Sequence, residues 1–233
     1  MAIQVHQSKH RGNQQAIASQ AITFDTNPTA GRSILIAVSN YNPTAANLIV
    51  SVTDNQGNTY LNAISNTINP FGTVLEAGIY YCFNIAASGS FTVTVNCSGG
   101  PTNYPNISGI EVSGIDTLDQ IGSEDNTAGT DASPSTSGAT TAGSEISVAA
   151  FAANTVSFED ISSTNGYTIF GETVGNSGAI YGAAAYSLLG TAGVETSSFD
   201  HFDADNVSVI STFKPAIPFI EPNIRVVHSA LRW

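Results

Sequence analysis

Short runs rich in β-branched and aromatic residues, each closed by turn-forming residues, recur along almost the whole chain. The clearest runs span residues 16–24, 33–41, 48–53, 59–64, 73–83, 91–97, 107–115, 145–152, 167–172, 179–189 and 207–213. Many short strands separated by turns are typical of a β-sandwich or barrel, whereas alternating strands and helices would indicate a parallel sheet. The sequence therefore predicts an all-β fold with antiparallel strands.

Local features support this interpretation. Asn and Gly, which tolerate positive φ, mark turns at residues 54–58 and 163–166. Residues 91–95 alternate between apolar residues and threonine, which indicates one buried face. Residues 178–190 contain three consecutive alanines, but the flanking glycines and two tyrosines favour a buried strand over a helix. Small and polar residues dominate 123–144, which predicts a long surface loop or a weak edge strand.

The charge is strongly negative and unevenly distributed. The formal net charge is -12, and all six basic residues lie outside residues 33–213, a stretch that holds 16 of the 18 acids. An acidic body repels phosphates and anionic membrane surfaces, so we expect neither nucleic acid nor a membrane as a partner. No apolar segment follows Lys9 and Arg11, and no run approaches 18 apolar residues, so we expect no signal peptide and no spanning helix.

Two cysteines, Cys82 and Cys97, provide little disulfide framework for 233 residues. We place them on neighbouring antiparallel strands that flank a turn at residues 86–90. A disulfide across these two strands is geometrically feasible. We favour free thiols, because opposed strand positions only sometimes meet the Cβ separation that a disulfide requires.

Several landmarks carry a resemblance to a known family: Val-Thr-Asp-Asn-Gln-Gly-Asn-Thr-Tyr at 52–60, Ile-Tyr-Tyr at 79–81, Val-Ser-Gly-Ile-Asp at 112–116, Asn-Gly-Tyr-Thr at 165–168 and Phe-Lys-Pro at 213–215. From about residue 21 to residue 215 the chain resembles a β-sandwich module of bacterial surface proteins and tailed-phage virion proteins, and it looks like a phage capsid decoration (cement) protein. The resemblance implies a jelly-roll-like sandwich and no catalytic residues. We expect an N-terminal arm (1–15), a sandwich (16–215) and an extended C-terminal arm (216–233).

The densest group of hard oxygen ligands is Asp200, Asp203 and Asp205, whose near-alternate spacing suits Ca²⁺. The group lacks the glycine turn and the bidentate glutamate of an EF-hand loop. We therefore favour a solvated acidic turn before the last strand, and we expect neither a metal nor a cofactor.

The histidines and tyrosines are the candidate residues for catalysis and for sugar binding. Three of the four histidines lie in the terminal arms, where rigid positioning of a base is least expected, so we predict that the protein is not an enzyme. Sugar rings stack on exposed aromatic side chains, and four tyrosines lie near predicted turns: Tyr41, Tyr60, Tyr104 and Tyr167. Half-buried tyrosines at strand ends are the commoner arrangement, so carbohydrate binding stays the alternative.

The C-terminal segment is the most informative part of the sequence. Three prolines within eight residues, at positions 215, 218 and 222, prevent a helix there and favour an extended conformation. Its large apolar side chains must pack against something, either the chain's own sandwich or a neighbour. We predict that the two arms form an interface through Lys9, Arg11, Ile217, Phe219, Ile220, Ile224, Arg225, Val226, Leu231, Arg232 and Trp233.

These observations lead to one expected function and one alternative. We expect a phage virion structural protein, made in the host cytoplasm, that decorates the head shell as a homotrimer and binds the major capsid protein and copies of itself. The alternative is a tail or fibre component with an adhesive, carbohydrate-binding sandwich.

Overall fold

The computed structural model describes residues 2–12, 15–44, 49–98, 102–154, 161–163, 165–173 and 180–217. Within these ranges the chain forms antiparallel strands and a single 3₁₀ turn, η1 (Pro70–Gly72). The strands are β1 (Gln4–Arg11), β2 (Ser19–Thr23), β3 (Ser33–Asn42), β4 (Ile49–Asp54), β5 (Leu61–Ile68), β6 (Val74–Cys82), β7 (Thr92–Cys97), β8 (Asn106–Ser113), β9 (Ile115–Ala132), β10 (Ile146–Asn154), β11 (Ser162–Ser163), β12 (Thr168–Thr173), β13 (Ile180–Leu188) and β14 (Phe199–Pro215). The predicted all-β antiparallel fold is confirmed. No helix among the described residues is long and apolar enough to cross a bilayer.

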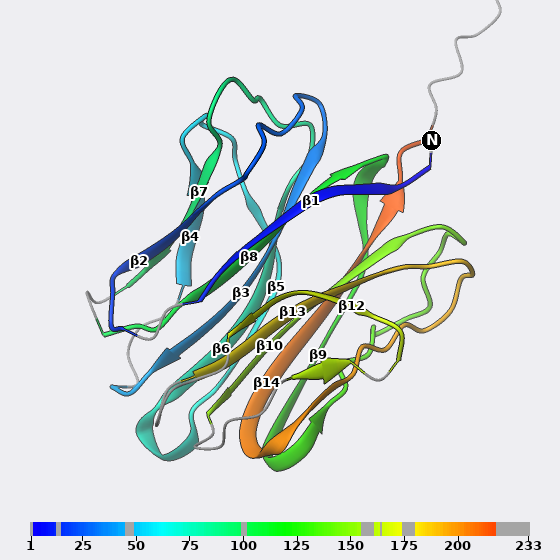
Figure 1. The fold of residues 1–233 in the computed structure, drawn as a ribbon. Helices are drawn as coiled ribbons and strands as arrows, with labels where there is room; N and C mark the ends of the chain where they lie inside the picture. Colours follow the sequence, from blue (N-terminus) through cyan, green and yellow to red (C-terminus); the bar gives the residue numbers. More distant parts are fainter. Residues whose placement is uncertain are drawn as a thin grey trace, which may run out of the picture.

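The strands build three sheets that stack as layers (Figure 1). The central sheet has the order β1-β8-β3-β6-β5, and a three-stranded sheet, β2-β7-β4, covers one of its faces. The C-terminal sheet, β11-β14-β10-β13-β12 with β9 alongside β14, covers the other face. A jelly roll has eight strands in two sheets, so the jelly-roll part of the prediction is not confirmed, although β1 to β8 are divided between two sheets.

The central sheet is buried on both faces, and strand β3 illustrates the cause. Its residues alternate by side: Ile34 and Ile36 pack toward the three-stranded sheet, whereas Leu35 and Ala37 pack toward the C-terminal sheet. A strand covered on both faces needs apolar residues at nearly every position, which explains the continuous run Ile-Leu-Ile-Ala-Val in its sequence.

The expected N-terminal arm is instead a strand of the central sheet. Strand β1 pairs with β8 in antiparallel register from Gln4↔Ser113 to Arg11↔Ile107. The prediction was wrong for residues 4–11 because β1 is mostly polar and half-exposed, so it lacks the apolar alternation of the other strands. Of the expected C-terminal arm, only Ala216 and Ile217 lie within the described residues.

Two further segments differ from expectation in the C-terminal sheet. The acidic stretch at residues 200–206, expected as a turn, belongs to β14, because Phe199 is fully buried and stacks on Phe151 at 5.4 Å between ring centroids. Within 123–144, residues up to Ala132 form the second half of β9, so the edge-strand alternative holds there. The strand prediction for residues 178–190 is confirmed by β13.

The two cysteines lie on different sheets, not on neighbouring strands. Cys82 ends β6 in the central sheet and Cys97 ends β7 in the three-stranded sheet, and both contact the apolar cluster between these sheets. Both are free thiols, as predicted.

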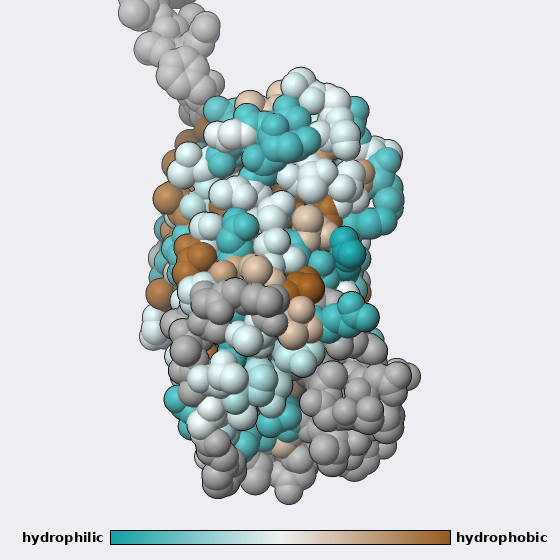
Figure 2. Space-filling view, turned by 90° about the vertical axis from the view of Figure 1, so that its left-hand side faces the viewer, coloured by the Kyte–Doolittle hydropathy of each residue, from teal (hydrophilic) through white to brown (hydrophobic). Residues whose placement is uncertain are grey.

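Figure 2 views the molecule from the side of the three-stranded sheet. On this face, hydrophilic (teal) and intermediate (white) residues surround separated hydrophobic (brown) ones.

Candidate functional site

An open apolar groove lies where residues 2–3 meet residues 215–217. Its volume is about 530 Å³. Two of its side chains are strongly exposed for apolar residues, Leu188 at 53% and Ile217 at 85%. Its lining, called the terminal groove below, consists of Ala2, Ile3, Ser144, Glu145, Leu188, Leu189, Pro215, Ala216 and Ile217. A pocket of this size lies in the range that proteins use to bind ligands or partner side chains.

The turn between β8 and β9 contacts both residue 2 and residue 216 beside the groove. Gly114 adopts a φ of +82°, and a Cβ atom there would lie 2.7 Å from the backbone oxygen of Ala2. The backbone N–H of Ala216 donates to the Gly114 carbonyl over 2.8 Å. A residue with positive φ and no Cβ is therefore needed where both ends meet, which only glycine supplies without strain. Figure 1 shows the N-terminus beside the end of β14.

Two carboxyl groups lie at the polar side of the terminal groove. Glu145 is 1% exposed and accepts a hydrogen bond from the Ala142 N–H at 2.8 Å. Burial raises the pKa of Glu145, and the neighbouring Asp119 carboxylate adds to that rise. Burial alone would also raise the pKa of Asp119, but the Lys214 ammonium at 2.7 Å and the Thr141 N–H lower it to about 2. The groove is thus apolar with one internally compensated charge pair beside it.

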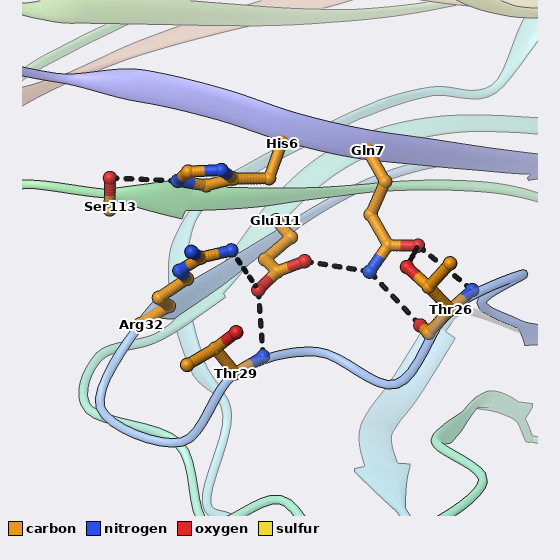
Figure 3. Close-up of polar contacts among 7 residues, drawn as sticks. All are labelled: His6, Gln7, Thr26, Thr29, Arg32, Glu111 and Ser113. Atoms are coloured by element: carbon orange, nitrogen blue, oxygen red, sulfur yellow. Dashed lines mark hydrogen bonds and ion pairs between the residues drawn. The ribbon is translucent and has the colours of Figure 1, made fainter.

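A buried carboxylate fastens β1, and with it the groove wall at Ala2 and Ile3, to the central sheet (Figure 3). Glu111 of β8 accepts hydrogen bonds from the Gln7 side chain at 2.6 Å, the Thr29 N–H at 2.8 Å and the Arg32 guanidinium at 2.9 Å. Gln7 in turn donates to the Thr26 carbonyl at 3.0 Å. Hydrogen bonds to a charged acceptor are stronger than neutral ones, so this network compensates for the few apolar contacts of a polar edge strand.

The predicted interface residues divide into three groups. Lys9 pairs with Asp25 at 2.5 Å and Arg11 donates to the Ala21 carbonyl at 3.4 Å, so both N-terminal cations contact the chain's own body. Ile217 lies at the rim of the terminal groove. The remaining predicted residues lie outside the described ranges: Phe219, Ile220, Ile224, Arg225, Val226, Leu231, Arg232 and Trp233.

The three predicted metal-candidate residues lie on β14. Asp200 is directly opposite Asp131 of β9 and lies 3.5 Å from the Ser162 hydroxyl, which donates to it. The side chain of Asp203 is outside the described set, while Asp205 pairs with Asn154 of β10 across the sheet. Among the side chains that the structure describes, no three His, Cys, Asp or Glu residues form a group that could hold a metal ion.

A histidine–serine pair that the sequence did not single out lies between β1, β8 and β12. His10 Nδ1 is hydrogen-bonded to the Ser108 hydroxyl at 2.8 Å, and His10 Nε2 to the Thr173 hydroxyl at 2.9 Å. Burial lowers the pKa of His10. A Cβ atom at Gly171 would lie 2.1 Å from the Ser108 oxygen, and the space beside the pair has essentially no volume for a water-sized molecule. The pair joins the central sheet to the C-terminal sheet.

The four tyrosines considered for sugar binding are used in two ways. Tyr60 packs half-buried against the apolar cluster of the three-stranded sheet and its hydroxyl donates to Asp54 at 3.1 Å, whereas Tyr167 is buried and its hydroxyl donates to Ser147 at 2.6 Å. Tyr41 and Tyr104 are half-buried and pack on each other in a tilted arrangement at 5.9 Å. Flat stacking on a sugar needs an exposed ring face, which these contacts do not favour.

The terminal groove was not predicted, because its lining comes from segments near residues 2, 144, 188 and 216 that no local pattern connects. A scan against protein-family models finds no family that matches this sequence, and a search of curated proteins finds no match either. A functional proposal for this protein therefore depends on the groove and on the residues around it.

Proposed function

We propose that this protein is a non-enzymatic structural component of a larger assembly, and specifically a decoration protein of a phage head. The observation that supports the proposal most is the terminal groove, an open apolar hollow whose rim carries the exposed side chain of Ile217. Apolar side chains that stay 53% and 85% exposed favour burial against another surface. Attachment through the terminal groove would leave the three stacked sheets unchanged on the outer surface of the assembly.

The charge distribution supports attachment through the C-terminal segment more than through the N-terminal one. Lys9, Arg32 and Lys214 each form an ion pair with a carboxylate of the body. Arg225 and Arg232, in contrast, belong to the segment beyond the groove. A shell surface that repels the acidic body would be approached most easily through this segment.

The resemblance noted in the sequence supports the specific form of the proposal. One of its landmarks, residues 52–60, has a clear structural role: Asp54 accepts hydrogen bonds from the N–H groups of Gln56 and Asn58 and from the Tyr60 hydroxyl. These contacts stabilise the turn after β4 and so serve the fold. The proposed partners are the major capsid protein and copies of the chain itself, arranged as a homotrimer on the head surface of the virion.

The test is binding to assembled particles. Purified full-length protein is mixed with undecorated phage heads, with tails and with an array of cell-surface glycans, and bound protein is measured by sedimentation or fluorescence. We expect saturable binding to heads, and a large loss of binding when Leu231 and Trp233 are both replaced by alanine. Binding to glycans or tails with none to heads would refute the proposal and support the adhesive alternative.

A further inference from the structure

We propose that the terminal groove is the receptor for the C-terminal segment, residues 218–233, of a second copy of this chain. The inference deepens the proposed function and rests on it for the biological setting, because it names the contact by which copies join. The groove has the apolar lining and the volume of about 530 Å³ that large side chains require. The segment supplies such side chains, ending in Leu231 and the chain's single tryptophan, Trp233.

The length of the segment favours a second copy over the chain's own segment. Pro215, Ala216 and Ile217 already form one wall of the groove, and the segment follows them directly in the sequence. Pro218 keeps Ile217 extended, since the residue before a proline avoids the helical region. An extended segment spans roughly 3.1 Å per residue, so Trp233 can lie about 50 Å from its own groove. In an extended segment, the largest anchor, Trp233, is the residue farthest along the chain from its own groove.

Size and charge agree with exchange between copies. A compact body of this length has a radius of gyration of about 17 Å, so a span of about 50 Å reaches past the body to a neighbour. The segment carries Arg225 and Arg232 against Glu221, whereas residues 33–213 carry 16 acids and no lysine or arginine. Opposite charge steers the segment of one copy toward the body of another. Repetition of the same contact around a ring closes the oligomer without open filaments.

The experiment uses two full-length variants that are each defective in one half of the contact. Leu188→Glu places a charge in the groove and keeps the segment, whereas Trp233→Ala removes the anchor and keeps the groove. Sedimentation equilibrium is measured for the wild type, for each variant alone and for their mixture. We expect the wild type to associate, and each variant alone to associate at least about tenfold more weakly. The mixture should form a 1:1 complex, because it contains one intact groove and one intact segment.

Tryptophan fluorescence provides the second readout. Trp233 is the only tryptophan, so the emission of the Leu188→Glu variant comes from the segment alone. Its emission should shift to shorter wavelength when Trp233→Ala protein, which contains no tryptophan, is added, because Trp233 then enters an apolar groove. Val50→Glu is the matched control, since Val50 is 61% exposed and lies on β4, away from the groove. The control should associate like the wild type. Ile217→Glu replaces Leu188→Glu if circular dichroism shows that the latter does not fold.

Several outcomes would overturn the inference. A wild type that stays monomeric while its Trp233 emission is buried, and becomes exposed in Leu188→Glu, would place the segment in its own groove. If a mixture of Leu188→Glu and Trp233→Ala forms no complex and shows no emission shift, the groove is not the receptor for the segment. If the wild type shows no self-association and still decorates phage heads at full occupancy, the inference fails while the proposed function stands. If the copies associate as expected but do not bind heads, the proposed function fails instead.

Discussion

A buried glutamate on β6 should make the stability of this protein decrease as the pH rises toward 7. Glu76 is 2% exposed, and its Oε2 accepts a hydrogen bond from the Ile49 N–H at 2.8 Å. Burial raises the pKa of Glu76 from 4.5 to about 7, even though the bonds from Ile49 and Asn40 oppose that rise. The folded state therefore binds more protons than the unfolded state between these two values, so the free energy of unfolding falls as the pH increases through this window.

The magnitude follows from the size of the shift. One pKa unit corresponds to about 1.36 kcal/mol, so the loss between pH 4.5 and pH 7 is about 3 kcal/mol. Glu76→Gln removes this term and keeps the shape of the side chain. The amide oxygen can still accept from the Ile49 N–H. The variant should match the wild type near pH 4.5 and exceed it by up to about 3 kcal/mol at pH 8.

The assay is urea unfolding at pH values from 4.5 to 8.5, with the slope m checked for constancy. Asp116→Asn is the control, because Asp116 is an exposed carboxylate on β9 and its replacement should leave the pH dependence of the wild type unchanged. Parallel stability curves for wild type and Glu76→Gln would refute the reasoning. Such a result would mean that water or a compensating charge reaches the carboxylate in the folded protein.

Four other predictions follow from the same structure. Glu111→Ala should lower the free energy of unfolding by about 2 to 3 kcal/mol, because it leaves Arg32 and two N–H groups without their acceptor, and hydrogen exchange should increase first in β1. Gly114→Ala should destabilise by about 1 to 3 kcal/mol in urea unfolding, since φ is +82° and Ala2 lies in contact. Burial raises the pKa of Cys82 and raises that of Cys97 to about 12, so both thiols should resist alkylation at pH 8 until the protein unfolds. A chelator should leave the melting temperature unchanged, and a fall of several degrees would instead indicate an ion bound at the acidic part of β14.

The strands of this protein could be predicted largely from its sequence, because each apolar strand carries its pattern within a few residues. Strand β7 and the residue before it are an example: Phe91, Val93 and Val95 alternate with threonines, and all three apolar side chains are fully buried. Turn chemistry was equally local, as at Asn165 and Gly166, where Gly166 adopts a φ of +84°. Such features depend on neighbours in the chain, so they survive without knowledge of the fold.

The polar strand β1 and the third layer could not be predicted in this way. Strand β1 exists because β8, about a hundred residues later, supplies its backbone partners and because Glu111 satisfies the polar groups around it. The start of β14 is likewise acidic in sequence and is held in the sheet by Phe199 stacking on Phe151. In both cases a long-range contact overrides the local preference of a polar segment for a loop.

At the candidate site, some features could be predicted from the sequence and others depend on the tertiary structure. From the sequence alone, the segment from Pro215 onward is predicted to be extended and apolar, and Ile217 is predicted to belong to an interface; both stay predictions. Leu75 and Leu188 both lie in strands of similar character, yet one is 0% exposed and the other 53%. Only the stacking of the three sheets decided which leucine is covered, because burial depends on the segments that pack above a residue and these come from distant parts of the chain. The terminal groove exists for the same reason: Ala2, Leu188 and Ile217 line one groove only because the β8–β9 turn holds the segments around residues 2 and 216 side by side.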